Sequence, residues 1–302
     1  MDFTANSKVL VQGITESIGS IYVPRMLEYG TQIVAGVCPG HGGSEQHGVP
    51  VFDMVDQALA KVGAIDTTVI LVPPYQALDA SLEAIAAGIP KIILITEGVP
   101  PLDMVRLIRK AEATDTLIVG PDSPGIIVPG QILLGTHPVD AYSPGDIGLI
   151  SRSGTLTYEV AHELTKAGFG QSIAVGIGGD RIVGSSFQQW LQILEEDDRT
   201  EAIVLVGEIG GDSEEVAAQY IGEAIDKPVI AFVAGRTVPR GRNLGHASAI
   251  IASQIAELGS DLGTADNKIA AFKRVGVPVA ERPSQIPGLL KQALQENSRN
   301  SA

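Results

Sequence analysis

The sequence predicts an α/β protein whose parallel β-sheets are covered by helices. Short runs rich in Val and Ile recur along the chain, and each is followed by a glycine-containing loop and then by a segment with the apolar spacing of a helix. Several of these helical segments end at a glycine, as at Gly30 and Gly88. With 302 residues and 44% hydrophobic content, the chain has enough apolar material for two domains with separate cores.

The first half of the chain carries one series of these units, which predicts a Rossmann-like N-terminal domain over residues 1–144. The stretch 121–144 is rich in Gly and Pro and weakly periodic, so we expect it to connect two domains. The expected strands are 8–11, 32–37, 68–72, 91–96 and 117–120, and the expected helices are 20–29, 53–61, 75–87 and 102–113.

A second α/β series predicts a C-terminal parallel-sheet domain over residues 145–295, followed by a polar tail, 296–302, that we expect to be disordered. Asp212 and Glu215 have the spacing of a capping box, in which side chains at a helix start bond to its backbone. The expected strands are 147–151, 173–176, 202–207, 229–234 and 277–280, and the expected helices are 155–166, 186–196, 212–224 and 267–275.

Charge and composition exclude several classes of function. Acidic side chains outnumber basic ones by 35 to 21, and the resulting net charge of −14 argues against a nucleic-acid partner. The apolar runs are too short to cross a bilayer, and the first residues lack the pattern of a signal peptide. A single cysteine, Cys38, excludes an intrachain disulfide framework and a cysteine-rich metal site. We expect an intracellular protein without a membrane partner or a metal site, in the cytoplasm or, if the source is eukaryotic, in the mitochondrial matrix.

Two glycine-containing loops of the first domain are candidates for ligand binding. The loop 12–19 (QGITESIG) lies between a strand and a helix, where a doubly wound sheet receives the phosphates of a nucleotide. It lacks the G-x-G-x-x-G fingerprint, so an NAD-dependent dehydrogenase is poorly supported, and a ligand loop and a tight turn both remain open. The loop 38–43 (CPGHGG) should lie beside it, with His41 either at a phosphate or simply exposed.

Two loops of the second domain have the composition of an anion site. The segment 151–155 (SRSGT) offers hydroxyl groups and backbone N–H groups at a helix start. The segment 207–211 (GEIGG) places Glu208 at the end of an apolar strand, where a buried carboxylate needs a partner. That partner is either a functional donor or a structural backbone, Lys or Arg group.

His246 is the strongest candidate for a reactive side chain. Its small neighbours, Gly245 and Ala247, allow a ligand to approach the ring closely. It follows a segment with three arginines, at positions 236, 240 and 242, in a chain that is short of positive charge. The other histidines have no comparable setting.

Five motifs of the C-terminal half match one known family in the correct order: 151–159 (SRSGTLTYE), 176–180 (GIGGD), 207–211 (GEIGG), 245–247 (GHA) and 263–266 (GTAD). The chain closely resembles the α subunit of the succinyl-CoA synthetase family over nearly its whole length. The resemblance implies an N-terminal Rossmann-like CoA-binding domain and a C-terminal flavodoxin-like ligase domain. It also implies a β subunit with an ATP-grasp fold, in an αβ or (αβ)2 assembly, that binds ATP or GTP with Mg²⁺.

The resemblance also implies roles for particular residues. His246 would carry a phosphoryl group, the carboxylate of Glu208 would orient its ring, and the helix start at Ser153, Gly154 and Thr155 would hold the phosphate. The other implied contacts are Tyr158 on the substrate side and, for CoA, Thr15, Glu16, Ser17, Ile18, His41, Ile95, Thr96 and Glu97.

The reaction implied by the resemblance has three reversible steps. The nucleotide phosphorylates the histidine, the phosphoryl group passes to the carboxylate of succinate, and the thiol of CoA attacks the acyl phosphate. Two alternatives remain open: a ligase for a related acid such as malate or citrate, and a CoA-binding regulatory module without catalysis.

The sequence departs from the family pattern at the CoA end. Glu16 replaces a usual glycine, His41 replaces a usual lysine, and Asp122-Ser123 stands in place of an Asn-Cys pair. The segment 253–262 is also longer than usual. Because a carboxylate repels CoA phosphates and a histidine is mostly neutral at pH 7, we expect weaker or shifted CoA binding.

Overall fold

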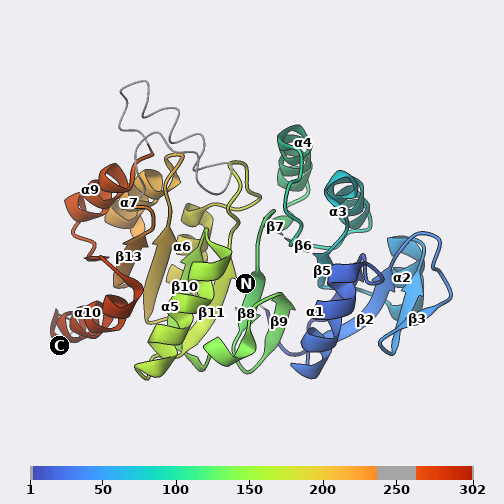
Figure 1. Ribbon diagram of the computed structural model, residues 1–302, viewed down its shortest axis with the longest axis horizontal. Coiled ribbons are helices and arrows are strands. Elements are labelled where there is room, and N and C mark those ends of the chain that lie inside the picture. The colour runs from blue at the N-terminus through green and yellow to red at the C-terminus, as the bar shows by residue number, and fades with distance from the viewer. Residues whose placement is uncertain (1–2, 237–262, 301–302) are drawn as a thin grey trace. The chain divides into compact units, whose positions relative to one another are not determined.

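The computed structural model describes residues 3–236 and 263–300, which fall into two compact units (Figure 1). The N-terminal unit holds the chain up to His137 together with the short segment 182–185, and the C-terminal unit holds 138–181 and the described residues from Ser186 onward. The sequence places the domain limit at 144, a few residues later. Among the described residues, no helix is long and apolar enough to cross a membrane.

The sheet of the N-terminal unit has the strand order of a Rossmann fold. Its strands, in spatial order, are β3 (Glu45–Gln46), β4 (Val49–Phe52), β2 (Gln32–Val37), β1 (Lys8–Gln12), β5 (Thr67–Ile70), β6 (Lys91–Leu94) and β7 (Leu117–Val119). All neighbours pair in parallel except β3 and β4. From β4 to β7 the order corresponds to 3-2-1-4-5-6, which puts a topological switch point beside β1.

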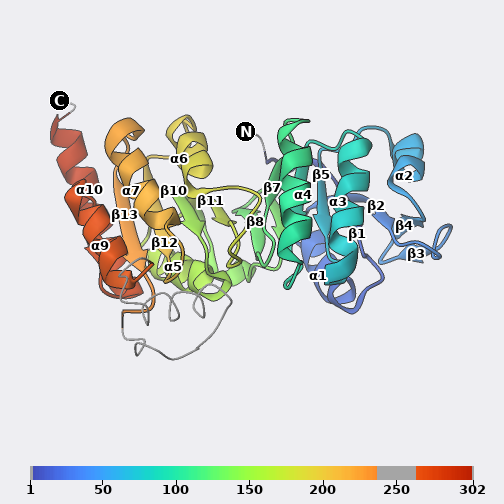
Figure 2. The same ribbon diagram turned by 90° about the horizontal axis from the view of Figure 1, so that it is seen from above.

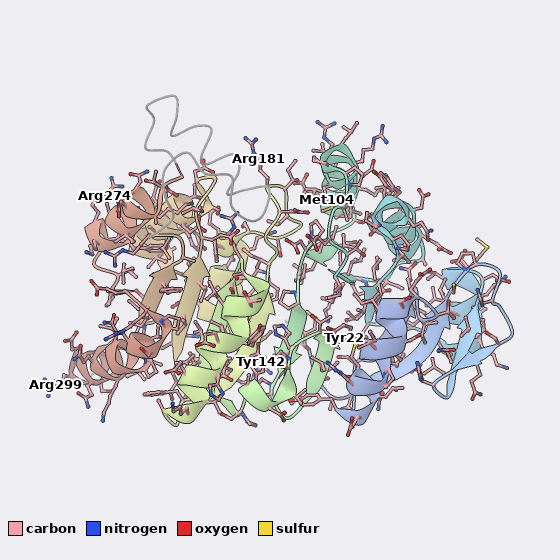
Figure 3. All side chains as sticks on the ribbon, in the orientation of Figure 1. Tyr22, Met104, Tyr142, Arg181, Arg274 and Arg299 are labelled. Atoms are coloured by element: carbon pink, nitrogen blue, oxygen red, sulfur yellow. The ribbon has the colours of Figure 1, made fainter. Side chains whose placement is uncertain are left out.

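Helices cover both faces of this sheet. Figure 2 shows α1 (Ser17–Glu28) on one face and α2 (Val55–Val62), α3 (Ala77–Ala86) and α4 (Pro101–Glu112) on the other. The side chain of Met104 on α4, labelled in Figure 3, is buried in a core with Leu10, Ile70 and Leu94 of the strands. The apolar faces of the helices therefore fix the carboxyl ends of the strands as one rigid edge.

The sheet of the C-terminal unit has a flavodoxin-like order. The parallel strands are β14 (Val279–Ala280), β13 (Val229–Val233), β12 (Ala202–Gly207), β10 (Pro144–Ser151) and β11 (Gln171–Gly176). In chain order this is 5-4-3-1-2, with the switch point at β10 and β12. The helices are α5 (Gly154–Lys166), α6 (Phe187–Glu195), α7 (Ser213–Ala224), α9 (Ala265–Arg274) and α10 (Ile286–Asn300). The predicted fold class is thus confirmed in both halves.

Three local predictions differ from the structure. The segment 121–144, expected to be a plain connection, contains an antiparallel hairpin of β8 (Gly125–Val128) and β9 (Ile132–Gly135) and a 3-10 turn, η2 (Val139–Ala141). Both hairpin strands are buried, and their short continuous apolar runs gave no alternating pattern to detect. Residues 296–300 of the predicted tail are also not disordered, because α10 continues to Asn300. Ile286 and Leu290 anchor this helix in the core, and the packing of its first half stabilises the helix including its polar end.

The predicted capping box at Asp212 is also wrong. Asp212 occupies the N-cap position of α7, but its side chain accepts no capping hydrogen bond. Glu215 reaches Lys268 instead of the backbone at the helix start. The reciprocal pair occurs elsewhere, between Ser186 and Gln189 at the start of α6.

Candidate functional site

Three loops of the N-terminal unit meet at the carboxyl edge of β1: the first is 12–19, the second is 38–43, and the third contains the run 95–97. The hydroxyl of Thr15 lies 2.8 Å from the sulfur of Cys38, which joins the first loop to the second. A Cβ atom on Gly13 would lie 3.0 Å from the backbone of Val72, after β5, and the hydroxyl of Thr96, after β6, donates to the Val72 carbonyl at 2.7 Å. The structure therefore brings the predicted CoA-contacting loops together at the switch point of the sheet.

The backbone packing of the first loop requires glycine at positions 13 and 19. Gly13 has a φ of 83°, a left-handed conformation that favours glycine. A Cβ atom on Gly19 would lie 2.5 Å from the Gly13 carbonyl oxygen, so α1 can approach the loop only with glycine there. Glu16 is the N-cap residue of α1, and its side chain, like those of Thr15, Ser17 and Ile18, is at least partly exposed at this edge.

The second loop uses its own backbone N–H groups internally. The carboxylate of Asp53 accepts hydrogen bonds from the N–H groups of Gly40 at 2.7 Å and Gly42 at 2.9 Å. The N–H of His41 donates to the Cys38 carbonyl, and that of Gly43 donates to Val51. Because these backbone donors are engaged, a ligand would have to be bound by the exposed His41 side chain.

The third loop presents one exposed side chain from the predicted run. Ile95 and Thr96 are buried, whereas Glu97 is exposed. Beside the three loops lies a cavity of about 230 Å³ lined by Gln12, Pro39, Val72, Gln76, Asp79 and Glu83, among others. The edge thus combines a concave surface with polar side chains, as small-molecule sites usually do.

In the C-terminal unit, the predicted phosphate-holding residues Ser153, Gly154 and Thr155, here called the phosphate cradle, form the N-terminus of α5. Ser153 is the N-cap residue, and its hydroxyl accepts a hydrogen bond from the Leu156 N–H at 3.3 Å. The hydroxyl groups of Ser153 and Thr155 lie 3.4 Å apart. Gly154 begins the helix, so its N–H and that of Thr155 point from the positive end of the helix dipole. This helix start can hold an anion.

Glu208 lies next to this cradle, at the end of the neighbouring strand β12. The N–H of Arg152 donates to the Val206 carbonyl at 3.1 Å, which ties the two strand ends together. The carboxylate of Glu208 lies 3.5 Å from the guanidinium of Arg152, and its side chain is 15% exposed. Arg152 is therefore one partner of Glu208, of the Lys or Arg kind that the sequence left open as a structural alternative.

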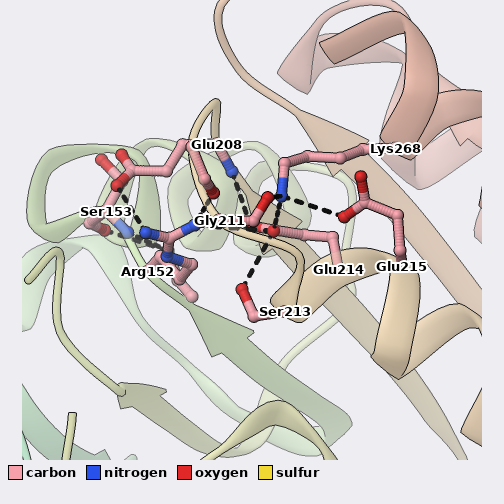
Figure 4. A network of polar contacts seen from close by, with 10 residues as sticks. Arg152, Ser153, Glu208, Gly211, Ser213, Glu214, Glu215 and Lys268 are labelled. Carbon is pink, nitrogen blue, oxygen red and sulfur yellow. Dashed lines mark hydrogen bonds and ion pairs between the residues drawn. The ribbon is translucent and has the colours of Figure 1, made fainter. Parts of the chain in front are cut away.

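A buried network of charged groups surrounds this position (Figure 4). Arg152 lies 3.1 Å from Glu214, and Lys268 contacts both Glu214 and, at 3.2 Å, Glu215. The backbone N–H of Glu208 also donates to Glu214, at 3.0 Å. Burial acts to raise the pKa of Glu214, but the charges of Arg152 and Lys268 outweigh it and hold that pKa below its usual range.

Sequence reasoning missed most of this network. From the sequence, Glu214 and Lys268 have no predicted role, and Arg152 is included only as a member of the segment 151–155. A signal was present, because Lys268 occupies a core-facing position of the amphipathic helix α9, where a lysine needs a buried anion. The identity of that anion depends on how α7 and α9 pack, which no local pattern encodes.

Two further predicted residues complete the comparison with the sequence. Tyr158 lies on α5 one turn beyond the cradle and is 37% exposed. Burial, with a smaller contribution from Tyr158, raises the pKa of Tyr142 above its usual value. His246 lies outside the described residues, as does the segment 253–262.

The two units match two family models that occur in this order along the chain. Residues 4–98 match the CoA binding domain, and residues 150–271 match the CoA-ligase domain. A CoA binding domain followed by a CoA-ligase domain defines a subunit of an acid–CoA ligase.

Curated relatives narrow this class. The chain is 48% identical over 288 residues to the α subunit 2 of an ADP-forming succinate–CoA ligase from Archaeoglobus fulgidus, covering 95% of this chain and 97% of that protein. It is 45% identical to the corresponding α subunit from Staphylococcus aureus, covering 96% of this chain and 94% of the relative. The chain belongs to the family of succinate–CoA ligase α subunits.

Solved structures share the fold at lower sequence identity. ATP citrate lyase from Methanothrix soehngenii, in complex with citrate and coenzyme A, has a TM-score of 0.87 and 24% identity. The match covers 100% of this chain, which spans 52% of that one. A dinucleotide-forming acetyl-coenzyme A synthetase from Ca. Korarchaeum cryptofilum has a TM-score of 0.70 and 23% identity, covering 97% of this chain and 60% of its own. These structures support the fold alone.

Proposed function

We propose that this chain carries a phosphoryl group on His246 for a ligase that reversibly makes succinyl-CoA from succinate, CoA and ATP or GTP. The observation that supports this most is the juxtaposition of Glu208 with the helix start at Ser153 and Thr155. A carboxylate beside an anion-holding helix start can orient an imidazole and stabilise its charge while the adjacent N–H groups hold the phosphate. A pure CoA-binding module needs neither feature.

The reaction proceeds by three displacements. A ring nitrogen of His246 takes the terminal phosphoryl group of the nucleotide, and ADP or GDP leaves. A carboxylate oxygen of succinate then takes the phosphoryl group, which regenerates the histidine and gives an acyl phosphate. The sulfur of CoA attacks the acyl carbon, its proton is lost, and inorganic phosphate leaves. The Ser153–Thr155 helix start holds the phosphoryl group at each stage.

CoA is assigned to the edge of the N-terminal sheet. The match to the CoA binding domain covers residues 4–98, which include the loops 12–19 and 38–43 and the run 95–97. The engaged backbone of the second loop leaves the His41 side chain as its contact, and the first loop offers Thr15 and Ser17. The nucleotide and its Mg²⁺ are assigned to a β subunit, as expected for an α subunit of a two-subunit ligase, in an αβ or (αβ)2 assembly. A single, buried Cys38 suits the reducing cytoplasm.

Transfer of labelled phosphate tests the proposal. The chain is co-purified with its candidate β subunit and incubated with γ-labelled ATP and Mg²⁺, and the acid-labile label on each subunit is measured. We expect label on this chain that succinate with CoA discharges, and that is absent from His246→Ala. Label that persists in His246→Ala would refute the assignment.

The identity of the acid has a second candidate. The similarity to ATP citrate lyase, whose structure contains citrate, is a likeness of fold that leaves a related acid open. Discharge of the labelled subunit by succinate, malate and citrate, each with CoA, distinguishes them. Discharge by succinate at least tenfold faster than by the other two is the expected result.

A further inference from the structure

Arg152 joins the two loops that the proposed reaction uses. It stands between Ser151, the last residue of β10, and Ser153, the N-cap residue of α5, and its side chain is 6% exposed. One terminal nitrogen donates to the Gly210 carbonyl at 3.0 Å and to the carboxylate of Glu214 at 3.1 Å. The other lies 3.5 Å from the carboxylate of Glu208. A single rigid guanidinium therefore contacts both the loop after β12 and the first turn of α7.

Glu214 contacts both Arg152 and the backbone of Glu208. Its side chain is fully buried, and it accepts hydrogen bonds from Arg152, from Lys268, from the hydroxyl of Ser213 at 3.0 Å and from the backbone N–H of Glu208 at 3.0 Å. Glu208 is consequently fixed at two points, its N–H by Glu214 and its carboxylate by Arg152 (Figure 4).

We propose that Arg152, held by Glu214, is a positioning residue for phosphoryl transfer that fixes the carboxylate of Glu208 beside the phosphate-holding helix start. The inference rests on the proposed function, because Glu208 needs a defined position only if it orients a reacting histidine. Positioning matters to this reaction since misplacing a reacting group by about 1 Å can cost about 100-fold in rate.

The geometry of the contacts explains why an arginine is needed. The planar fork of a guanidinium presents separate nitrogens to two carboxylates, whereas the ammonium of a lysine is a point charge on a flexible chain. The closer partner is Glu214, at 3.1 Å, and Glu208 lies farther away, at 3.5 Å. Arg152 thus reaches Glu208 with one terminal nitrogen while the other is held by Glu214.

A purely structural ion pair is the competing explanation, because buried arginine–glutamate pairs often serve the fold alone. The two explanations differ in what a lysine can replace. A lysine at position 152 supplies the charge that Glu214 needs but cannot bridge Glu214 and Glu208. If the role is structural, Arg152→Lys recovers both stability and rate, and if it is positioning, the rate stays low.

The test uses Arg152→Lys and Arg152→Met, each purified as the complex with the β subunit. The measurements are the melting temperature, the single-turnover rate of labelling by γ-labelled ATP, the ATP concentration that gives half the maximal rate, and the CoA affinity. Glu215→Gln is the matched control, since Glu215 also binds Lys268 but directs its contacts to Lys268 and Asn267 rather than to Arg152 or the Glu208 backbone.

We expect Arg152→Lys to label at least about tenfold more slowly than the wild type, with ATP and CoA affinities within about twofold and most of the stability lost in Arg152→Met restored. Glu215→Gln should label at the wild-type rate. Labelling of Arg152→Lys at the wild-type rate overturns the inference, as does an Arg152→Lys chain that fails to assemble, since that places the residue in the framework of the fold. A wild-type complex that takes no label on this chain signals failure of the proposed function itself.

Discussion

The carboxylate of Glu214 lies 3.1 Å from the guanidinium of Arg152, and the exposed fractions of these side chains are 0% and 6%. Each charged group is shielded from solvent, so each needs the opposite charge of the other to offset the cost of burial. Lys268 is a second cation for Glu214. The pair also joins the end of β10 to the first turn of α7, beside the candidate site. The fold and the candidate site therefore share the same buried side chains.

Removal of the guanidinium should destabilise the chain strongly. Arg152→Met leaves Glu214 with one cation instead of two, and losing one partner of a buried pair costs about 3–5 kcal/mol in the free energy of unfolding. The pKa of Glu214 is held low in the folded state, so its stabilising contribution is present above its unfolded pKa and is lost as the pH falls through the folded value. In Arg152→Met the folded pKa rises, and acid unfolding should begin at a higher pH.

Urea unfolding at pH 7 and at decreasing pH measures both effects. Arg199→Met is the control, because Arg199 pairs with Asp197 at 2.9 Å but is 41% exposed. A surface pair of this kind contributes about 0–1 kcal/mol. Equal losses in the two variants would contradict the assignment of Arg152 to a buried network.

Loss of the Ser153 hydroxyl should affect stability and phosphoryl transfer together. Ser153→Ala removes the cap on the Leu156 N–H, which costs about 1 kcal/mol in the free energy of unfolding. The same change at Ser186, the N-cap residue of α6, removes a comparable cap from Gln189 outside the candidate site. We expect similar stability losses in Ser153→Ala and Ser186→Ala, but slower labelling by γ-labelled ATP in Ser153→Ala alone. Equal labelling rates would show that the cradle hydroxyl is not needed.

The stability of the N-terminal unit should fall between about pH 6.5 and pH 4 because of His137. Burial lowers the pKa of this histidine to about 4, although its hydrogen bond to the Gly125 carbonyl acts in the opposite direction. The unfolded chain therefore binds a proton at a pH where the folded chain does not. The stability that depends on the neutral ring is complete above about pH 6.5 and declines as the pH falls, and the loss amounts to about 3 kcal/mol by pH 4.

A variant that cannot titrate isolates this effect. Glutamine keeps a donor for the Gly125 carbonyl, so His137→Gln should have a smaller decrease of stability between pH 7 and pH 4.5 in urea unfolding. His162→Gln replaces an exposed histidine on α5 and should retain the wild-type pH dependence. An unchanged pH profile in His137→Gln would rule out the buried ring as the cause.

Much of the fold could be predicted because it follows from local patterns. The apolar runs of β1 and β12 and the glycine after α1 mark their elements without reference to the rest of the chain. The hairpin β8–β9 could not be predicted, since its buried strands lack alternation and are recognised by their packing.

The candidate site was predictable to a similar degree. Glu208 and the Ser153 cradle could be found because each occupies a strand-to-helix loop, a position that a parallel sheet brings to one edge. The role of Asp53 in occupying the N–H groups of Gly40 and Gly42 could not, because it depends on a side chain 11 to 13 residues away in a separate turn. Lys268 and Glu214, 54 residues apart, meet for a similar reason, through the packing of α7 and α9.

Replacement of His41 by lysine should tighten CoA binding. With the backbone of the second loop bonded to Asp53, the side chain at position 41 is the contact that this loop can offer a phosphate. A lysine carries a full charge at pH 7 on a long, flexible side chain, so His41→Lys adds an exposed charge worth about 1 kcal/mol, or about fivefold in Kd.

Calorimetric titration of CoA at low and high salt tests this prediction. The gain should shrink as salt is added, because exposed charges are screened. His47→Lys is the matched control, since His47 is also exposed but lies in the turn between β3 and β4, outside the three loops. An equal gain in His47→Lys would reveal a non-specific effect of charge, and no gain in His41→Lys would mean that the second loop does not contact a phosphate of CoA.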